Sequence, residues 1–295
     1  MNWTNRRKAF RKQFQSDMCV FPGSVFDPIS ARIARDLGFE IGMFAGSVAS
    51  LTVLGEPDHI VLTLSEFAQQ AYRIGRASEL PLMVDADHGY GNALNVKRTV
   101  EELETAGVSG LSIEDTVLPR PFGSGGKTEL TSVEEGVGKM KAAVAGRQDP
   151  LLMISARTSA PLVTGIDDTL ERISAYQDTG VDALFLIGIK SRHDLDKVVG
   201  MAQLPLVLGG AGKEIMDLPY LGSMGVRLCL QGHQPIMAAI RATYNTLSAL
   251  RRGVPPSELQ GIPDKSLVSK FDGSRDYERW IKAFLEPSEK GSLRD

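Results

Sequence analysis

The sequence contains few cysteines and no long apolar run. Cys19 and Cys229 are its only cysteines among 295 residues, so a framework of several disulfides is excluded, and we expect a reducing, cytoplasmic compartment. No apolar segment approaches the roughly 20 residues that a membrane-spanning helix needs. The basic N-terminal segment 1–14 is not followed by the apolar core of a secretory signal, so we expect no export signal there.

An excess of charge of one sign is also missing. Lys and Arg number 33 against 36 Asp and Glu, which gives a net charge of −3. This balance offers no large basic surface for nucleic acid, and a hydrophobic share of 42% is typical of a globular protein with a sizeable core. We predict that segment 1–14 forms a solvated helix rather than a nucleic-acid-binding arm.

Short apolar runs alternate along the chain with amphipathic segments of helical period. We interpret the runs as strands, at residues 19–27, 40–47, 80–87, 109–115, 151–158, 183–188, 205–210 and 226–232. The clearest helical segments are 29–38, 64–79, 93–107, 169–180 and 236–252. Eight such units predict an α/β protein with one (β/α)8 barrel domain over residues 1–295, with an N-terminal helix and a C-terminal helical extension. An open doubly wound sheet is the alternative.

Polar side chains follow the carboxyl ends of five predicted strands. In a parallel barrel these ends form one face, and active sites lie there. We therefore predict that the polar residues converge on one site, although they are far apart in the sequence. The set comprises Ser47, Asp85, Asp87, His88, Glu114, Asp115, Arg157, Thr158, Gln231 and His233.

The segment LMVDADHGYGN, residues 82–92, places two aspartates at the end of an apolar strand. Asp85 and Asp87 point to the same side because side chains alternate along a strand. Together with Glu114 they would repel one another unless a cation lay among them. Oxygen ligands without a His/Cys set suit a hard cation, so we predict a site for Mg²⁺, with Mn²⁺ as an alternative. A simpler alternative is that one aspartate caps a helix beginning near Asn92.

Several motifs in the same order resemble the isocitrate lyase / phosphoenolpyruvate mutase superfamily. They are DADHGYGN (85–92), IED (113–115) and ARTSA (156–160), with support from SVFDPISARIARDLGFE (24–40), AGSVAS (45–50) and SVEEGVGKMKAA (132–143). The resemblance implies an Mg²⁺-dependent (β/α)8 protein that acts on small 2-oxo or 2-hydroxy acids. It also implies a homotetramer, a dimer of dimers in which the eighth helix is swapped between subunits.

The resemblance assigns a role to each acidic residue of the site. Asp85 would be the direct metal ligand, and Asp87 and Glu114 would act through coordinated water. Asp58, in the loop after the second predicted strand, matches a further acidic position of the family.

Three other residues would contact the substrate by the same resemblance. Ser47 would hold a substrate carboxylate through its backbone and side chain, and Arg157 would pair with the same substrate in the two-pronged manner of a guanidinium. His233 would contact the departing carboxylate or its surroundings. A structural ion pair with a neighbouring acid is the alternative for Arg157, and a structural role is the alternative for His233.

Departures from the family pattern indicate the subgroup. The loop LPRPFGSGGKTELTS, residues 118–132, has neither the Cys nor the His of the lyases; it offers Lys127 but not the Asn of the phosphonomutases. These features and His233 resemble the branch of oxaloacetate decarboxylases. Two departures remain: LVLGGAGKE (206–214) lacks that branch's Tyr, and Ser159 stands where relatives carry Asn, Asp or Glu.

The resemblance thus implies Mg²⁺-dependent decarboxylation of oxaloacetate to pyruvate and CO₂ through a metal-stabilised enolate. Three alternatives stay open. The chain could cleave a C–C or C–P bond of another small acid, such as 2-methylisocitrate or a phosphonopyruvate. Lys190 could form a Schiff base with a 2-oxo acid without metal. The barrel could also bind a metabolite without turnover.

Overall fold

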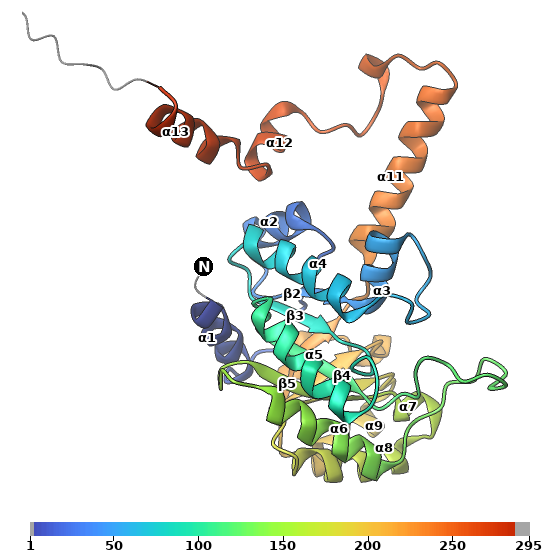
Figure 1. Cartoon of the computed structure of the whole chain (residues 1–295). Coiled ribbons are helices and arrows are strands. Elements are labelled where there is room, and N and C mark those ends of the chain that lie inside the picture. Colours follow the sequence, from blue (N-terminus) through green and yellow to red (C-terminus); the bar gives the residue numbers. More distant parts are fainter. Residues whose placement is uncertain (1–2, 287–295) are drawn as a thin grey trace, which may run out of the picture. The chain divides into compact units, whose positions relative to one another are not determined.

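The computed structural model describes residues 3–286, and its strands form one parallel sheet in which neighbours pair in sequence order (Figure 1). The strands are β1 (Gly23–Ser24), β2 (Gly42–Ala45), β3 (Leu82–Asp85), β4 (Gly110–Glu114), β5 (Met153–Thr158), β6 (Ala183–Ile187), β7 (Leu206–Gly209) and β8 (Val226–Leu230). Each strand lies within one of the eight predicted runs. The predicted (β/α)8 fold is therefore confirmed.

The segment before β1 joins the first strand to the last. Val20 donates its N–H to the carbonyl of Arg227 (3.1 Å) and accepts a hydrogen bond from the N–H of Cys229 (3.0 Å). These bonds form a parallel bridge between Val20 and Leu228 in β8. The strand residues are almost entirely buried, as continuous apolar runs covered on both faces should be.

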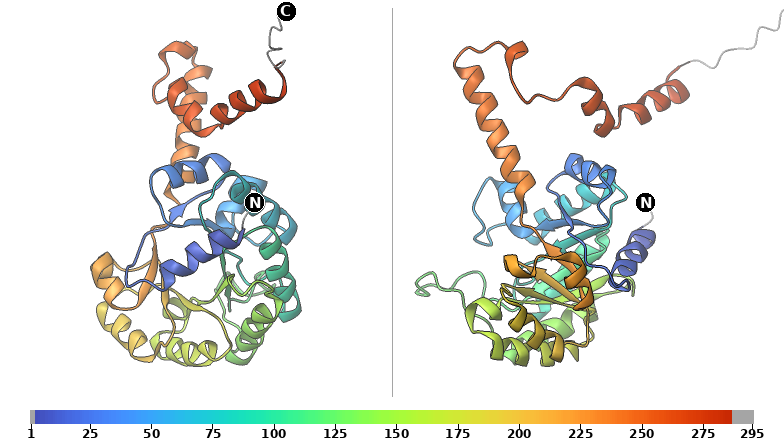
Figure 2. Two further views of the ribbon diagram at one scale, coloured as in Figure 1. Left: turned by 90° about the vertical axis from the view of Figure 1, so that its left-hand side faces the viewer. Right: turned by 180° about the vertical axis from the view of Figure 1, so that it is seen from behind.

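Helices between the strands surround the sheet (Figure 2, left). They are α2 (Pro28–Asp36), α3 (Gly46–Ala49), α4 (Leu64–Ala77), α5 (Ala93–Thr105), α6 (Val133–Gly146), α7 (Ala160–Val163), α8 (Ile166–Gln177), α9 (Arg192–Met201) and α10 (Leu218–Ser223). A π-helical segment, Ser50–Leu54, continues α3. The helices predicted at 29–38, 64–79, 93–107 and 169–180 correspond to α2, α4, α5 and α8.

Three of these helices begin with a capping box. In this motif the side chain of the N-cap residue and that of the residue three positions later each accept from the other's backbone N–H. The pairs are Asp27 with Ser30 in α2, Thr63 with Glu66 in α4, and Asn92 with Asn95 in α5. Asn92 accepts from the N–H of Leu94 at 2.9 Å. Because Asn92 itself caps α5, neither Asp85 nor Asp87 is needed as a cap, and that alternative is wrong.

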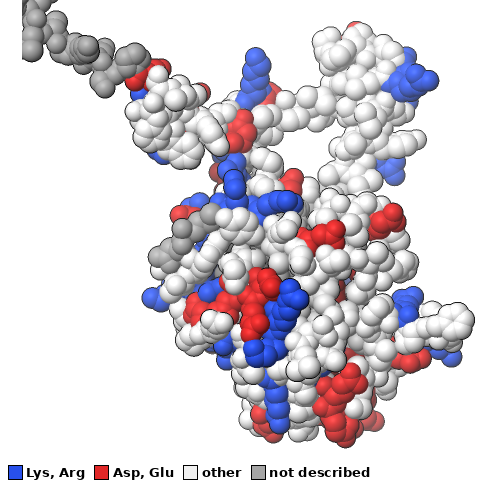
Figure 3. Space-filling view, viewed as in Figure 1, with Lys and Arg blue, Asp and Glu red and all other residues white. Residues whose placement is uncertain are grey.

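The surface of the barrel carries charges of both signs. On the face shown in Figure 3, acidic and basic side chains lie next to one another. Helix α5 contributes two ion pairs of helical spacing, Lys97 with Glu101 and Arg98 with Glu102. None of the helices within residues 3–286 is long and apolar enough to span a membrane.

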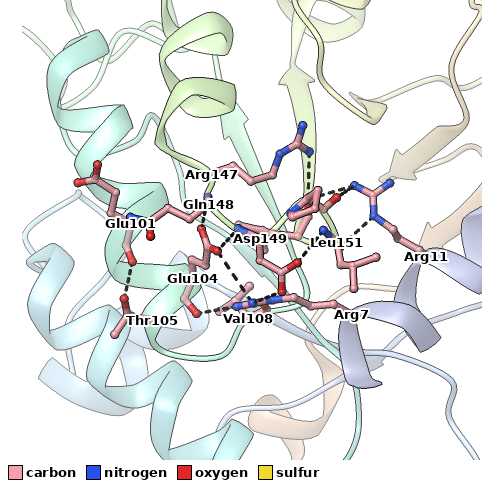
Figure 4. A network of polar contacts seen from close by, with 12 residues as sticks. Arg7, Arg11, Glu101, Glu104, Thr105, Val108, Arg147, Gln148, Asp149 and Leu151 are labelled. Atoms are coloured by element: carbon pink, nitrogen blue, oxygen red, sulfur yellow. Dashed lines mark hydrogen bonds and ion pairs between the residues drawn. The ribbon is translucent and has the colours of Figure 1, made fainter. Parts of the chain in front are cut away.

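The predicted N-terminal helix is present as α1 (Trp3–Phe14), but only one of its faces is exposed to solvent, because the other packs against the barrel. Phe10 is 1% exposed and Arg7 is 5% exposed. Arg7 donates to the carbonyls of Val108 (3.0 Å) and Glu104 (2.6 Å) and pairs with Asp149 at 2.6 Å (Figure 4). The basic composition of the segment predicted that its charged side chains would be exposed. Arg7 can be buried because these partners satisfy the hydrogen-bond donors of its guanidinium.

The chain divides into two compact units, one up to Met237 and one that begins at Ala238. Helix α11 (Gln234–Arg251) crosses this boundary, and α12 (Lys265–Phe271) and α13 (Ser274–Phe284) follow it. The predicted apolar stripe of α11 is mostly exposed: Ile236 is buried, whereas the exposed members are Met237, Ile240, Tyr244, Leu247 and Leu250. A stripe of this kind requires a covering surface.

Candidate active site

A cavity of about 600 Å³ lies at the carboxyl ends of the strands. It is within the usual size range of pockets for small molecules. All seven residues to which the sequence assigned a role in the site line it: Ser47, Asp58, Asp85, Asp87, Glu114, Arg157 and His233. The barrel therefore brings together side chains that are separated by up to almost two hundred residues of sequence.

The acidic side chains enter the cavity from adjacent elements. Asp85 ends β3, Glu114 ends β4, and Asp87 follows β3 with a left-handed backbone (φ +48°). The segment around Asp87 packs tightly, since a Cβ added at Gly46 would lie 2.2 Å from Asp87 Oδ2. Glycine at position 46 thus allows the backbone before Ser47 to approach the carboxylate.

Burial and mutual repulsion act together on these acids. Burial, followed by the charges of Asp85 and Glu114, raises the pKa of Asp87 well above its ordinary value. Burial also raises the pKa of Glu114, against the opposing effect of Arg157. Burial and the nearby Asp85 raise the pKa of Asp58. The cluster is therefore short of positive charge.

Arg157 is the basic side chain that faces the cluster most directly. Its Nη1 pairs with Asp85, and its Nη2 lies 3.1 Å from Glu114 Oε2. Its guanidinium also lies over the ring of Phe185, 5.5 Å from the centroid. Burial lowers the pKa of Arg157, but Asp85 and Glu114 raise it by more, so the group is a permanent cation. The ion pair with a neighbouring acid, which was the alternative to a substrate-binding role for Arg157, is therefore present.

The donor set fits a hard divalent cation. Several buried carboxylate oxygens face one cavity, and a single guanidinium offsets only part of their charge. Within residues 3–286, no three His, Cys, Asp or Glu side chains converge closely enough to form a ready-made metal cage, and Arg157 pairs with both Asp85 and Glu114. The Nε of Arg157 is buried and has no hydrogen-bond partner among these residues.

His233 follows β8 and lines the same cavity, next to the first strand. Its Nδ1 shares a hydrogen bond of 3.0 Å with Ser24 Oγ in β1. Burial lowers the pKa of His233, so the imidazole is neutral near pH 7. Ser24 is a residue that sequence reasoning missed, since its role depends on contact between the first and last strands.

The loop between β4 and α6 contributes residues that the sequence did not single out. Thr116, Arg120 and Thr128 line the cavity, whereas Lys127, the lysine noted in the loop, does not. Ser159 and the glycine pair Gly209 and Gly210 line it too, within the two segments that the sequence analysis expected to depart from the family pattern.

Lys190 is an exposed residue next to the cavity wall and does not line the cavity. It is not among the lining residues in the described chain, and its Nζ donates a 2.6 Å hydrogen bond to the carbonyl of Gly210. The side chain is exposed to solvent, and its amine is occupied by a backbone carbonyl and not directed at the acid cluster. The geometry therefore favours the acid cluster as the chemical centre.

Comparisons with known proteins agree with this geometry. The family model described as phosphoenolpyruvate phosphomutase matches residues 10–251. An oxaloacetate decarboxylase of Bradyrhizobium diazoefficiens is 57% identical over 270 residues, which cover 92% of this chain and 93% of that protein. An oxaloacetate decarboxylase of another Bradyrhizobium strain is 51% identical over 287 residues, covering 97% of this chain and 99% of its own length.

Solved structures with the same fold include two enzymes with bound ligands. A phosphonopyruvate hydrolase in complex with oxalate and Mg²⁺ has a TM-score of 0.83 at 25% identity, over 95% of this chain and 99% of that one. An oxaloacetate acetylhydrolase with the inhibitor 3,3-difluorooxalacetate has a TM-score of 0.84 at 27% identity, over 96% and 98%. The family prediction is confirmed: the chain belongs to the phosphoenolpyruvate phosphomutase family.

Proposed function

We propose that this protein decarboxylates oxaloacetate to pyruvate and CO₂ with Mg²⁺ as its cofactor and Mn²⁺ as an alternative. The observation that carries the proposal is the convergence of four acidic side chains and Arg157 on one cavity. The relatives named oxaloacetate decarboxylase support the choice of substrate. The phosphonopyruvate hydrolase structure with oxalate and Mg²⁺ supports a divalent metal.

The acids would hold the metal with different roles. Asp85 would be the direct ligand, Asp87 and Glu114 would bind it through water, and Asp58 would lie farther out. When bound, the metal supplies Lewis acidity, which draws electron density from the 2-oxo group of the substrate. It also offsets the repulsion among the carboxylates, which leaves donors of Arg157 for the substrate.

The reaction itself breaks one carbon–carbon bond. The C3–C4 bond of oxaloacetate cleaves, C4 leaves as CO₂, and the bonding electron pair moves toward the 2-oxo oxygen. Water then supplies a proton to C3, which gives pyruvate. Ser47 and Arg157 would fix the carboxylate at C1, so that the scissile bond is held in one orientation.

His233 would stand beside the departing carboxylate. A neutral imidazole can give a hydrogen bond without the full positive charge that would stabilise the carboxylate in the ground state. Its hydrogen bond with Ser24 fixes the ring. The site would therefore orient the leaving group while retaining little affinity for its negative charge.

We also infer a homotetramer in which α11 is exchanged between subunits. The exposed residues of its apolar stripe, such as Ile240, Tyr244 and Leu247, support a covering partner. Family resemblance suggests the barrel of a second subunit as that partner.

A product assay with the full-length protein tests the function. With Mg²⁺ and oxaloacetate, we expect enzyme-dependent formation of pyruvate, above the rate in buffer with metal alone. Oxalate and acetate would instead indicate hydrolysis, the reaction of the acetylhydrolase relatives. Cleavage of 2-methylisocitrate or phosphonopyruvate at a comparable rate would refute the proposed subgroup. Metal binding without turnover of any substrate would support a non-catalytic barrel.

A further inference from the structure

Asp85 has a hydrogen-bond partner that belongs to the neighbouring strand. Asp85 in β3 is in register with Ser112 in β4, and Ser112 Oγ donates to Asp85 Oδ1 at 2.9 Å. The N–H of Ala86 also donates to the carbonyl of Ser112 at 3.1 Å. Backbone pairing thus sets the two side chains at the same level of the barrel, and the hydroxyl adds one specific contact.

The environment makes this contact a strong one. Ser112 is 0% exposed, and it lies in register between Asp85 of β3 and Ser155 of β5. A hydroxyl that is buried away from water costs free energy unless it is hydrogen-bonded. A bond from a hydroxyl to an ionised carboxylate is about twice as strong as one between neutral groups. Ser112 therefore holds Asp85 Oδ1 in a fixed position.

The two oxygens of Asp85 consequently have different surroundings. Oδ1 is engaged by Ser112 within the wall of the barrel, whereas Oδ2 meets the guanidinium of Arg157 in the cavity. Oδ1 is therefore held by the barrel wall, whereas Oδ2 faces the cavity, where it pairs with Arg157 and is the oxygen that a metal ion in the cavity would meet.

We propose that Ser112 makes Asp85 a one-oxygen metal ligand and thereby favours Mg²⁺ over Ca²⁺. Mg²⁺ takes few protein ligands in a strict octahedron, whereas Ca²⁺ takes 6–8 oxygens and often both oxygens of a carboxylate. The inference rests on the metal site of the proposed function and adds the residue that sets its selectivity. Ser112 acts through Asp85 and is a positioning residue.

Metal binding without substrate tests this directly. The full-length protein is freed of metal with EDTA and titrated by calorimetry with Mg²⁺ alone and with Ca²⁺ alone. In Ser112→Ala the dissociation constant for Mg²⁺ should rise about tenfold, as when a residue supporting a metal ligand is lost. The constant for Ca²⁺ should change less, so the preference for Mg²⁺ falls. Ser112→Thr keeps the hydroxyl and should restore the preference.

Ser109→Ala is a matched control from the same segment. Ser109 directly precedes β4, is 0% exposed, and its hydroxyl has no hydrogen-bond partner within the described chain. Its removal should leave both metal affinities unchanged. Thermal unfolding of each variant shows whether a change in affinity reflects loss of fold.

Two results would distinguish a failure of the Ser112 proposal from a failure of the proposed metal site. If the wild type binds Mg²⁺ but Ser112→Ala keeps the same ratio of affinities, the role of Ser112 is refuted and the proposed function stands. If the wild type binds no Mg²⁺, the metal site itself is refuted, and this inference with it. Should Ser112→Ala not fold, Ser112→Cys offers a weak donor of similar size. A wild-type ratio of affinities in that variant would equally overturn the proposal.

Discussion

The guanidinium of Arg172 on α8 lies 2.9 Å from Oδ2 of Asp115, with 6% and 0% of the two side chains exposed. Tyr176 donates its hydroxyl to the same oxygen at 2.7 Å, and Arg172 also donates to the carbonyl of Thr131 at 3.0 Å. Asp115 begins the loop that contributes Arg120 to the cavity, and Thr131 ends it. One arginine therefore anchors both ends of that loop, directly behind Glu114.

Replacement of Arg172 should destabilise the protein strongly. In Arg172→Met, Asp115 stays buried without its cation, and loss of one partner of a buried pair costs about 3–5 kcal/mol. Urea unfolding followed by circular dichroism measures the difference. Arg279, which pairs with Asp276 at the same 2.9 Å but is exposed, is the matched control. Arg279→Met should change stability by less than about 1 kcal/mol. Equal effects of the two substitutions would contradict a role for burial.

Loss of the direct metal ligand should abolish turnover and leave the barrel folded. In Asp85→Ala we expect decarboxylation to fall at least ~100-fold, because the Lewis acid contributes several kcal/mol to the transition state. EDTA should silence the wild type, and added Mg²⁺ should restore it. Pyruvate release and circular dichroism are measured in parallel. Lys190→Met, which changes a residue outside the cavity, should keep full activity. Wild-type activity that survives EDTA and disappears in Lys190→Met would instead indicate Schiff-base chemistry.

The pair of Arg7 and Asp149 should make stability depend on pH in the acid range. Burial raises the pKa of Asp149, but hydrogen bonds from Arg7 and from the N–H of Leu151 lower it below its ordinary value overall. The ionised form is thus favoured in the folded chain. Its stabilisation is complete above the unfolded pKa, about 4, and is lost as the pH falls through the folded pKa.

Asp149→Asn tests this dependence. At pH 7 the variant should be less stable by about 1.5–3 kcal/mol, the usual contribution of a hydrogen bond to a charged group. Below about pH 4 the difference from the wild type should shrink. Unfolding by urea at several pH values measures it. A difference that grows on acidification would show that the carboxylate is not stabilised by Arg7.

Assembly should depend on the apolar stripe of α11. We expect the wild type to sediment as a tetramer at low micromolar concentration. Leu247→Glu places a charge in the middle of the stripe, at a residue that is 62% exposed in the single chain. It should dissociate the assembly, because burial of an unpaired charge is costly. Glu258→Gln, in the polar segment after α11, serves as a control. An active, well-folded monomeric wild type would refute the proposed tetramer.

Sequence reasoning located the strands because buried parallel strands are continuous apolar runs. It also predicted that Asp85, Asp87 and Glu114 lie together, because carboxylates at the ends of apolar strands stand out in the sequence, and all three line the cavity. It missed Ser112 and Ser24, whose contacts with Asp85 and His233 come from the arrangement of strands and not from their own neighbours in sequence. It misjudged α1, because the partners that satisfy Arg7 are carbonyls and acids of distant segments.

The hydrogen bond between Ser24 and His233 joins groups that are 209 residues apart in the chain. Contacts of such long sequence range form late, since loop closure must come before they contribute stability. In a chain still emerging from the ribosome, Ser24 and the residues of β3 and β4 are therefore synthesised well before His233 exists to meet Ser24. During refolding, we expect enzymatic activity to recover later than the circular dichroism signal of the helices. The return of activity would then mark closure of the barrel between its first and last strands.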